Sequence, residues 1–128
     1  MSKESEANVR ATGGCLCGAI RYEVHGPLRD VVICHCHFCQ RMNTQAAAYT
    51  ACAPSDLKLV TSQKLRWYRS SPRSRRGFCG KCGSALFWEP TPLTHISISA
   101  GSLNPPTGLK VKEHIFLAQR ADYEEPSS

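Results

Sequence analysis

The sequence contains no apolar stretch long enough to cross a membrane, and its first ten residues, MSKESEANVR, lack the apolar segment of a secretion signal. These two absences predict a cytoplasmic chain that does not associate with membranes. In that reducing setting, clustered cysteines bind metal or react more often than they form disulfides. The eight cysteines of this chain therefore need an explanation in which the thiols stay reduced.

Helix-forming patterns are also scarce. The best candidate is a short helix from His37 to about Asn43, and the chain has no internal repeat or low-complexity tract. Short runs that alternate apolar and polar residues are typical of β-strands. We expect strands at 19–24, 46–52, 57–60, 65–68, 85–88, 95–99 and 114–118. The segment TSQK, between the third and fourth of these strands, predicts a hairpin turn.

Length and composition favour one mainly β domain. A chain of 128 residues suits one domain, and a hydrophobic content of 41% supplies a core without help from disulfides. We expect this domain to span residues 11–123, after a disordered lead-in at 1–10 and before a tail at 124–128. The net charge of +6 suits an anionic small molecule or a nucleic acid without requiring either.

Two close cysteine pairs have the spacing of a metal site. CGKC at 79–82 separates its cysteines by two residues and CLC at 15–17 by one, and glycines beside both pairs permit tight turns. Together, Cys15, Cys17, Cys79 and Cys82 supply four thiolates, which is the closed tetrahedral set of a structural zinc. Such a site would join the first strand to a hairpin much later in the chain. The alternative is a set of buried or redox-active thiols.

The segment CHCHFC, at 34–39, supplies a different number of ligands. Cys34, Cys36 and Cys39 fill three positions of a zinc tetrahedron, and an open fourth position distinguishes catalytic zinc from structural zinc. His35 or His37 could close the site and make it structural, although residues adjacent to a ligand usually point elsewhere. The spacing also allows the CLC pair to share one site with two of these three cysteines.

A zinc ion with three thiolate ligands is a weak Lewis acid, because those ligands already donate much charge. It is poorly suited to amide hydrolysis. It can hold an incoming thiol as a thiolate, since coordination to the metal deprotonates the sulfur. We therefore expect the group formed by Cys34, Cys36 and Cys39 to make or break a carbon–sulfur bond.

Three segments, GGCLCGAIRYEV, CHCHFCQR and RSSPRSRRGFCGKCGSALF, together resemble the glutathione-dependent formaldehyde-activating family, which also includes the centromere-protein-V-like proteins. The resemblance runs from about Gly13 to about Tyr123 and keeps the family's order and spacing of the cysteine blocks. It implies a fold similar to that of Mss4-like, or β-tent, proteins, with antiparallel sheets pinned by zinc and little helix.

The resemblance also implies two zinc ions per chain and an activity. It implies a structural zinc on Cys15, Cys17, Cys79 and Cys82, and a catalytic or labile zinc on Cys34, Cys36 and Cys39. The implied activity is the addition of glutathione to formaldehyde, which is a carbon–sulfur lyase reaction when it runs in reverse. The family often ends its domain with a proline–tryptophan pair, whereas this chain has Asp122 and Tyr123. If that end lines the pocket, we expect a different choice of substrate.

Four arginines, Arg69, Arg73, Arg75 and Arg76, precede the CGKC pair, and Arg41 follows the second site. Because arginine binds a carboxylate through two parallel hydrogen bonds, Arg41 and Arg76 are candidates for holding glutathione. The favoured alternative for any single one is an exposed arginine on a hairpin edge or a short helix. We expect structural roles for four further residues. Cys52 is expected to be a buried free thiol, His114 a hydrogen-bonded histidine, and Trp67 and Trp88 core aromatics.

Three functions are consistent with these residues. The favoured one is a zinc-dependent carbon–sulfur lyase-type enzyme that acts on a small thiol, such as glutathione, and an aldehyde. The second is a non-catalytic zinc module that binds nucleic acid or a protein partner. The basic residues are few and only Trp67 and Tyr68 interleave with them, so nucleic acid is a poor candidate. The third is a structural or thiol-sensing protein in which both zinc sites are closed.

Overall fold

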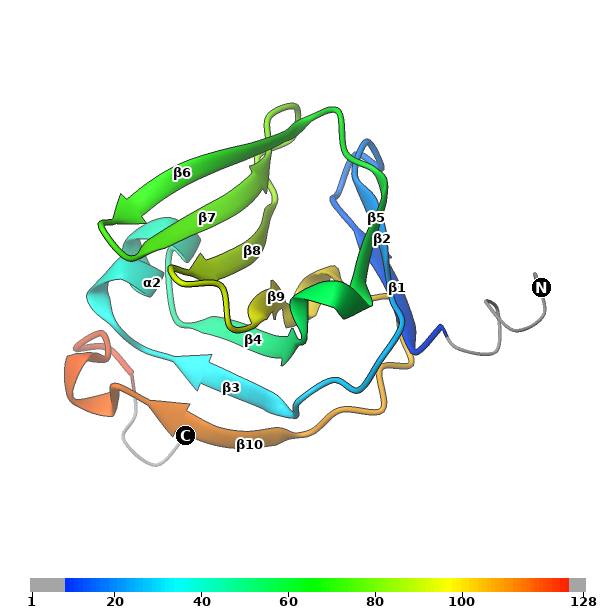
Figure 1. Cartoon of the computed structure of the whole chain (residues 1–128). Coiled ribbons are helices and arrows are strands. Elements are labelled where there is room, and N and C mark those ends of the chain that lie inside the picture. Colours follow the sequence, from blue (N-terminus) through cyan, green and yellow to red (C-terminus); the bar gives the residue numbers. More distant parts are fainter. Residues whose placement is uncertain (1–8, 125–128) are drawn as a thin grey trace.

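The computed structural model describes residues 9–124, and within them the chain forms two β-sheets, one short α-helix and three 3₁₀ turns (Figure 1). Residues 1–8 and 125–128 lie outside the described residues, so most of the expected lead-in and tail is not described. No helix within 9–124 has the length and apolar character needed to span a membrane.

The smaller sheet has three strands. Its central strand, β2 (Arg21–Val24), pairs antiparallel with β1 (Ala11–Gly14) on one side and β5 (Leu57–Thr61) on the other. The alternation of the β2 residues explains its orientation, because Tyr22 and Val24 are buried while the Arg21 side chain faces solvent. This orientation is the one that the sequence predicts.

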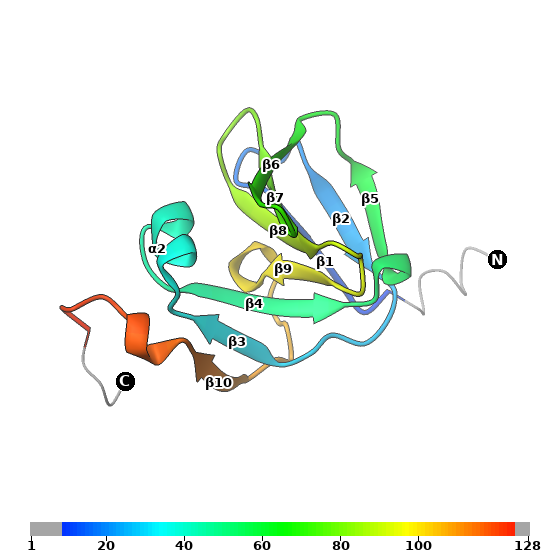
Figure 2. The same ribbon diagram turned by 60° about the vertical axis from the view of Figure 1, so that its left-hand side comes forward.

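The larger sheet has seven strands, in the order β10-β3-β4-β9-β8-β7-β6. Their bounds are β3 (Val31–Cys34), β4 (Ala47–Cys52), β6 (Leu65–Ser71), β7 (Ser74–Cys79), β8 (Ala85–Pro90), β9 (Ile96–Ser99) and β10 (Val111–Ile115). Neighbouring strands are antiparallel except for β10 and β3, which run parallel. Figures 1 and 2 both show the smaller sheet on one side of the molecule and the helix on the other.

The helix α2 (His37–Asn43) is the one α-helix in the described part of the chain, and it lies where the sequence predicts it. The sulfur of Cys36 caps its first turn by accepting a hydrogen bond from the N–H of Cys39 at 3.3 Å. The helix ends at Thr44, whose φ of 65° is left-handed. The 3₁₀ turns are η1 (Pro54–Asp56), η2 (Ala100–Ser102) and η3 (Leu117–Gln119).

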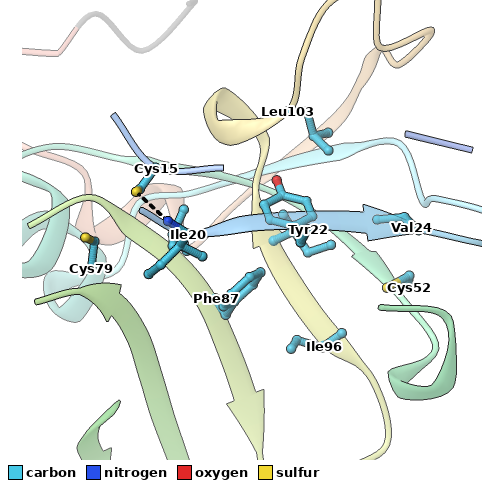
Figure 3. Close-up of a cluster of buried hydrophobic side chains, with 11 residues drawn as sticks. Cys15, Ile20, Tyr22, Val24, Cys52, Cys79, Phe87, Ile96 and Leu103 are labelled. Atoms are coloured by element: carbon cyan, nitrogen blue, oxygen red, sulfur yellow. Dashed lines mark hydrogen bonds between the residues drawn. The ribbon is translucent and has the colours of Figure 1, made fainter. Parts of the chain in front are cut away.

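The two sheets meet in one hydrophobic core (Figure 3). Tyr22 of β2 packs edge-on against Phe87 of β8, with ring centroids 5.4 Å apart, and Ile20, Leu86 and Ile98 are fully buried beside them. Burial of such a side chain contributes about 1.5–3 kcal/mol to folding. The contact between β2 and β8 holds the turn after β1 against the turn after β7, where the first two cysteine pairs lie.

The predicted hairpin between 57–60 and 65–68 is wrong. Both segments are strands, but β5 pairs with β2 in the smaller sheet, whereas β6 pairs with β7 in the larger one. Alternation identifies a strand without selecting its partner. The partner of β6 is β7, which the sequence did not predict because its residues, SRRGFC, include two adjacent charges and do not alternate between apolar and polar.

Three strands were not predicted, namely β1, β3 and β7. Strand β1 carries Gly13 and Gly14, and glycine is disfavoured in strands. Strand β1 nevertheless pairs with β2, and Gly13 lies so close to Tyr22 that a Cβ at this position would overlap the Tyr22 hydroxyl. The close approach therefore requires glycine at position 13. The strand expected at 114–118 begins earlier and stops at Ile115, since Phe116 is left-handed, with a φ of 56°.

Candidate metal centres and the adjoining cavity

The first cluster contains four cysteines from two turns. Cys15 and Cys17 lie in the turn between β1 and β2, and Cys79 and Cys82 lie where β7 turns into β8. The four sulfurs lie within 4.8 Å of one another, and the Cys17 sulfur is 3.6 Å from that of Cys15 and 3.8 Å from that of Cys79. A tetrahedral zinc with bonds of about 2.3 Å places its sulfurs about 3.8 Å apart. The donor set and its spacing therefore fit zinc.

Backbone N–H groups in both turns favour thiolates at this cluster. The Cys15 sulfur accepts from the N–H of Ile20 at 3.2 Å, and the Cys79 sulfur accepts from the N–H groups of Lys81 and Cys82 at 3.3 and 3.4 Å. Burial raises the pKa of Cys15, but the Ile20 N–H and the thiols of Cys17 and Cys79 outweigh burial, and the pKa is lowered overall. Such hydrogen bonds support the deprotonated ligands that a metal needs.

The position of this cluster predicts a structural role. One turn belongs to the smaller sheet and the other to the larger sheet, so an ion held there would join the two sheets. Four protein ligands leave no position for a substrate. None of Cys34, Cys36 and Cys39 is in this group, so the shared arrangement with the CLC pair does not form.

The second cluster forms where β3 leads into α2. Cys34 ends the strand, Cys36 caps the helix and Cys39 lies in the first turn, which brings the three sulfurs within 4.8 Å of one another. A hydrogen bond from the Cys39 thiol is the main cause that lowers the pKa of Cys34 to about 5, and the positive charge of Arg76 acts in the same direction. The pKa of Cys39 is raised in return, because it is the proton donor of the pair. A bound cation would favour deprotonation of the whole group.

Neither neighbouring histidine completes the second cluster. The Nε2 atom of His35 is 2.9 Å from Nδ1 of His114, and its Nδ1 atom is 3.3 Å from a carboxylate oxygen of Glu124. His37 is exposed at the start of α2. Within residues 9–124 the group consists of three cysteines and no histidine. The cluster therefore fits a metal site with three protein ligands and an open fourth position, and His114 has the hydrogen bond expected of it.

A cavity of about 280 Å³ opens onto this cluster. Strands that are distant in the sequence form its walls, with Tyr49 from β4, Arg76 from β7, Trp88 from β8 and Ile115 from β10. Trp88, expected in the core, is half-buried and lines the cavity instead. Trp67 does pack against the core, with its ring 6.3 Å from that of Phe87.

The four arginines of the basic segment have different surroundings. Arg76 is 7% exposed, lines the cavity and donates from Nη1 to the Tyr49 hydroxyl at 3.0 Å. Arg75 instead pairs with Glu89 at 2.8 Å and lies over the ring of Trp67. The other two, Arg69 and Arg73, are exposed, as expected of a hairpin edge. The structure therefore brings one of the four to the cavity.

Several other candidates lie outside the cavity. Arg41 is exposed on α2 and lines a separate groove with Phe38 and Tyr68, so the structure does not bring it to the second cluster. Asp122 and Tyr123 are exposed and do not line the cavity. One thiol, at Cys52, is buried in the main core away from both clusters, and burial raises its pKa to about 11.

Sequence reasoning missed several residues of the cavity, among them Tyr49 and Arg29. Tyr49 is the one large side chain in the strand segment AAAYTAC, and small neighbours leave space around a ring. That contrast was a usable signal. Burial raises the pKa of Tyr49, so its hydroxyl stays protonated and can donate a hydrogen bond. Arg29 precedes β3 in a loop, and no local pattern marks it.

The segment after β10 fastens the loop that carries the second cluster. The side chain of Gln119 accepts from the N–H of His37 at 3.1 Å. The amide nitrogen of Gln40 donates to two carbonyls, that of His35 at 2.9 Å and that of Gln119 at 2.6 Å. With Glu124 beside His35, the C-terminal residues therefore hold the three cysteines in place.

The fold and the sites define a class: a mainly β protein in which a four-cysteine site joins two sheets and a three-cysteine site adjoins a cavity. The chain matches the family model described as "Glutathione-dependent formaldehyde-activating enzyme" over residues 10–119, and it belongs to that family. The mainly β fold with two cysteine clusters, which the resemblance predicts, is thereby confirmed.

A solved structure is also similar to this chain. It is the crystal structure of a Rhodobacter sphaeroides protein, with a TM-score of 0.64 and 26% sequence identity. The match covers 80% of this chain and 98% of that protein.

Proposed function

We propose that this protein is a zinc-dependent enzyme of the carbon–sulfur lyase type that adds glutathione or another small thiol to formaldehyde or a related aldehyde, giving an S-hydroxymethyl adduct. The observation that carries the proposal is the second cluster, in which three cysteines lie beside a cavity and no side chain of residues 9–124 completes the set. Membership of the family supports the same assignment. The free thiols of all eight cysteines suit a reducing, cytoplasmic setting.

The reaction makes one carbon–sulfur bond. The sulfur of the thiol attacks the carbonyl carbon, and the thiol proton ends on the new hydroxyl group. A zinc ion on Cys34, Cys36 and Cys39 would supply one thing, a lowered pKa for a thiol at its open position. Residues of the cavity supply the rest: its walls hold the two reactants together, and the protonated Tyr49 hydroxyl can donate to the carbonyl oxygen.

The test is the rate of adduct formation above the uncatalysed rate, measured for wild type, Cys36→Ser and Cys52→Ser. Cys52→Ser is the matched control, because Cys52 is a buried thiol outside both clusters. We expect Cys36→Ser to lose the excess rate with its fold and its first zinc retained, and Cys52→Ser to keep the excess rate if it folds. An excess rate that survives in Cys36→Ser would show that the proposed site is wrong.

A further inference from the structure

Arg76 lines the cavity and has a buried, unpaired hydrogen-bond donor. Its side chain is 7% exposed, and its Nη1 atom donates to Tyr49 at 3.0 Å. Its Nε atom is buried without a hydrogen-bond partner, and no aspartate or glutamate of residues 9–124 forms an ion pair with Arg76. A buried guanidinium is costly unless an anion or an acceptor meets it. The missing partner points to a ligand.

The rest of the cavity wall favours an anionic ligand. Arg29 adds a second guanidinium, whose hydrogen bonds go to the backbone carbonyls of Tyr49 at 3.1 Å and Asp30 at 3.3 Å rather than to an acidic side chain, and the charge of Glu113 also acts on it. The wall contains no aspartate or glutamate. The planar guanidinium of Arg76 offers adjacent N–H groups in the geometry that matches a carboxylate.

The position of Arg76 limits how far that carboxylate can be from the reacting sulfur. Arg76 and the three cysteines line the same cavity. The volume of about 280 Å³ lies below the range of about 300–1,000 Å³ that is typical for drug-sized ligands. One small molecule can therefore reach both Arg76 and the three cysteines.

We propose that the thiol substrate is a small mercapto-carboxylic acid, whose carboxylate binds Arg76 while its sulfur lies at Cys34, Cys36 and Cys39. This inference rests on the proposed function and narrows its substrate class. In glutathione the carboxylates lie at the two ends of a tripeptide, far from the sulfur. In the reaction, the acid's sulfur bonds to the aldehyde carbon, the C=O π bond becomes an O–H bond with the thiol proton, and the carboxylate is unchanged.

The experiment measures binding by calorimetry on the zinc-loaded protein, with no aldehyde present. Three probes are compared: 3-mercaptopropionate, its uncharged amide and glutathione. We expect wild type to bind the acid at least tenfold more tightly than the amide, because the amide lacks the negative charge. The acid should also bind more tightly than glutathione, because glutathione lacks the short spacing between sulfur and carboxylate. In Arg76→Gln the affinity for the acid should fall to the affinity for the amide. The control Arg73→Gln changes an exposed arginine, and its affinities should match those of wild type.

The comparison of probes on wild type does not depend on whether a variant folds. Equal affinity for the acid and the amide would overturn the inference, and so would tighter binding of glutathione or undiminished acid binding in a folded Arg76→Gln. The binding readout also separates this inference from the proposed function. Selective acid binding without any adduct formation on adding formaldehyde would retain the carboxylate site and reject the enzyme. Adduct formation at the same rate from acid and amide would reject the carboxylate site alone.

Discussion

Gln40 offers a sharp test of how the second cluster is held together. Its side-chain amide bridges the loop of the cysteines to the C-terminal segment, with bonds of 2.9 Å to the His35 carbonyl and 2.6 Å to the Gln119 carbonyl. Gln40→Ala removes both bonds and leaves the three cysteines unchanged. Each hydrogen bond contributes about 1 kcal/mol, so the free energy that stabilises the ordered loop should fall by about 2 kcal/mol.

That loss converts in full into metal affinity when the loop is disordered without zinc and zinc binds its ordered form. A change of about 1.4 kcal/mol is a factor of ten in an equilibrium constant, so zinc should bind the second cluster about 30-fold more weakly in Gln40→Ala. The four-cysteine site shares no contact with Gln40, and its affinity should not change. Competition with a chromophoric chelator, titrated through both zinc equivalents, measures the two affinities separately.

Arg41→Ala is the matched control, because Arg41 is the next residue of α2 and is exposed. Its zinc affinities should equal those of wild type. If Gln40→Ala and Arg41→Ala release the second zinc at the same chelator concentration, the C-terminal segment does not hold this loop, and the reasoning fails.

Three further predictions concern the thiols and the core. In the metal-free protein the pKa of Cys34 is about 5, so the rate of its alkylation by iodoacetamide should fall as the pH drops through 5 and the thiolate is protonated. Cys52, a buried thiol with a pKa of about 11, should react only after unfolding. Mass spectrometry of the labelled peptides measures both rates. Ile98→Ala should lower the free energy of unfolding by about 2–5 kcal/mol in urea titrations, because Ile98 is fully buried between the sheets. Chelation of zinc should lower the melting temperature of wild type, and Cys79→Ser, which loses only the first site, should melt below wild type without chelator. Equal melting temperatures with and without metal would contradict the structural role of the first cluster.

The sequence was most informative where the chemistry is local. Two residues separate Cys79 from Cys82, and Gly83 follows with a φ of 82°. Their spacing alone predicts a turn in which both sulfurs face one ion. Cys36 and Cys39 likewise face one another across the first turn of α2. Period and spacing over a few residues suffice for such features, and the family resemblance supplied the pairing of distant blocks.

Features that depend on distant residues could not be predicted. Whether β5 pairs with β6 or β2 depends on which faces the core covers, and both choices satisfy the same alternation. Arg76 and Arg73 look alike in the segment RSSPRSRRGF, yet the first is buried beside Tyr49 and the second faces solvent. Glu124 lies in the expected tail, and its contact with His35 arises because β10 returns alongside β3.

The account depends most on the open position at the second cluster. X-ray absorption spectroscopy of the protein with two zinc ions per chain tests it directly, because it counts sulfur ligands. Four sulfurs at one site and three at the other predict an average of about 3.5 sulfurs and 0.5 oxygen or nitrogen per zinc, with Zn–S bonds of about 2.3 Å. An average of four sulfurs, or an imidazole signal from His35 or His37, would contradict the account.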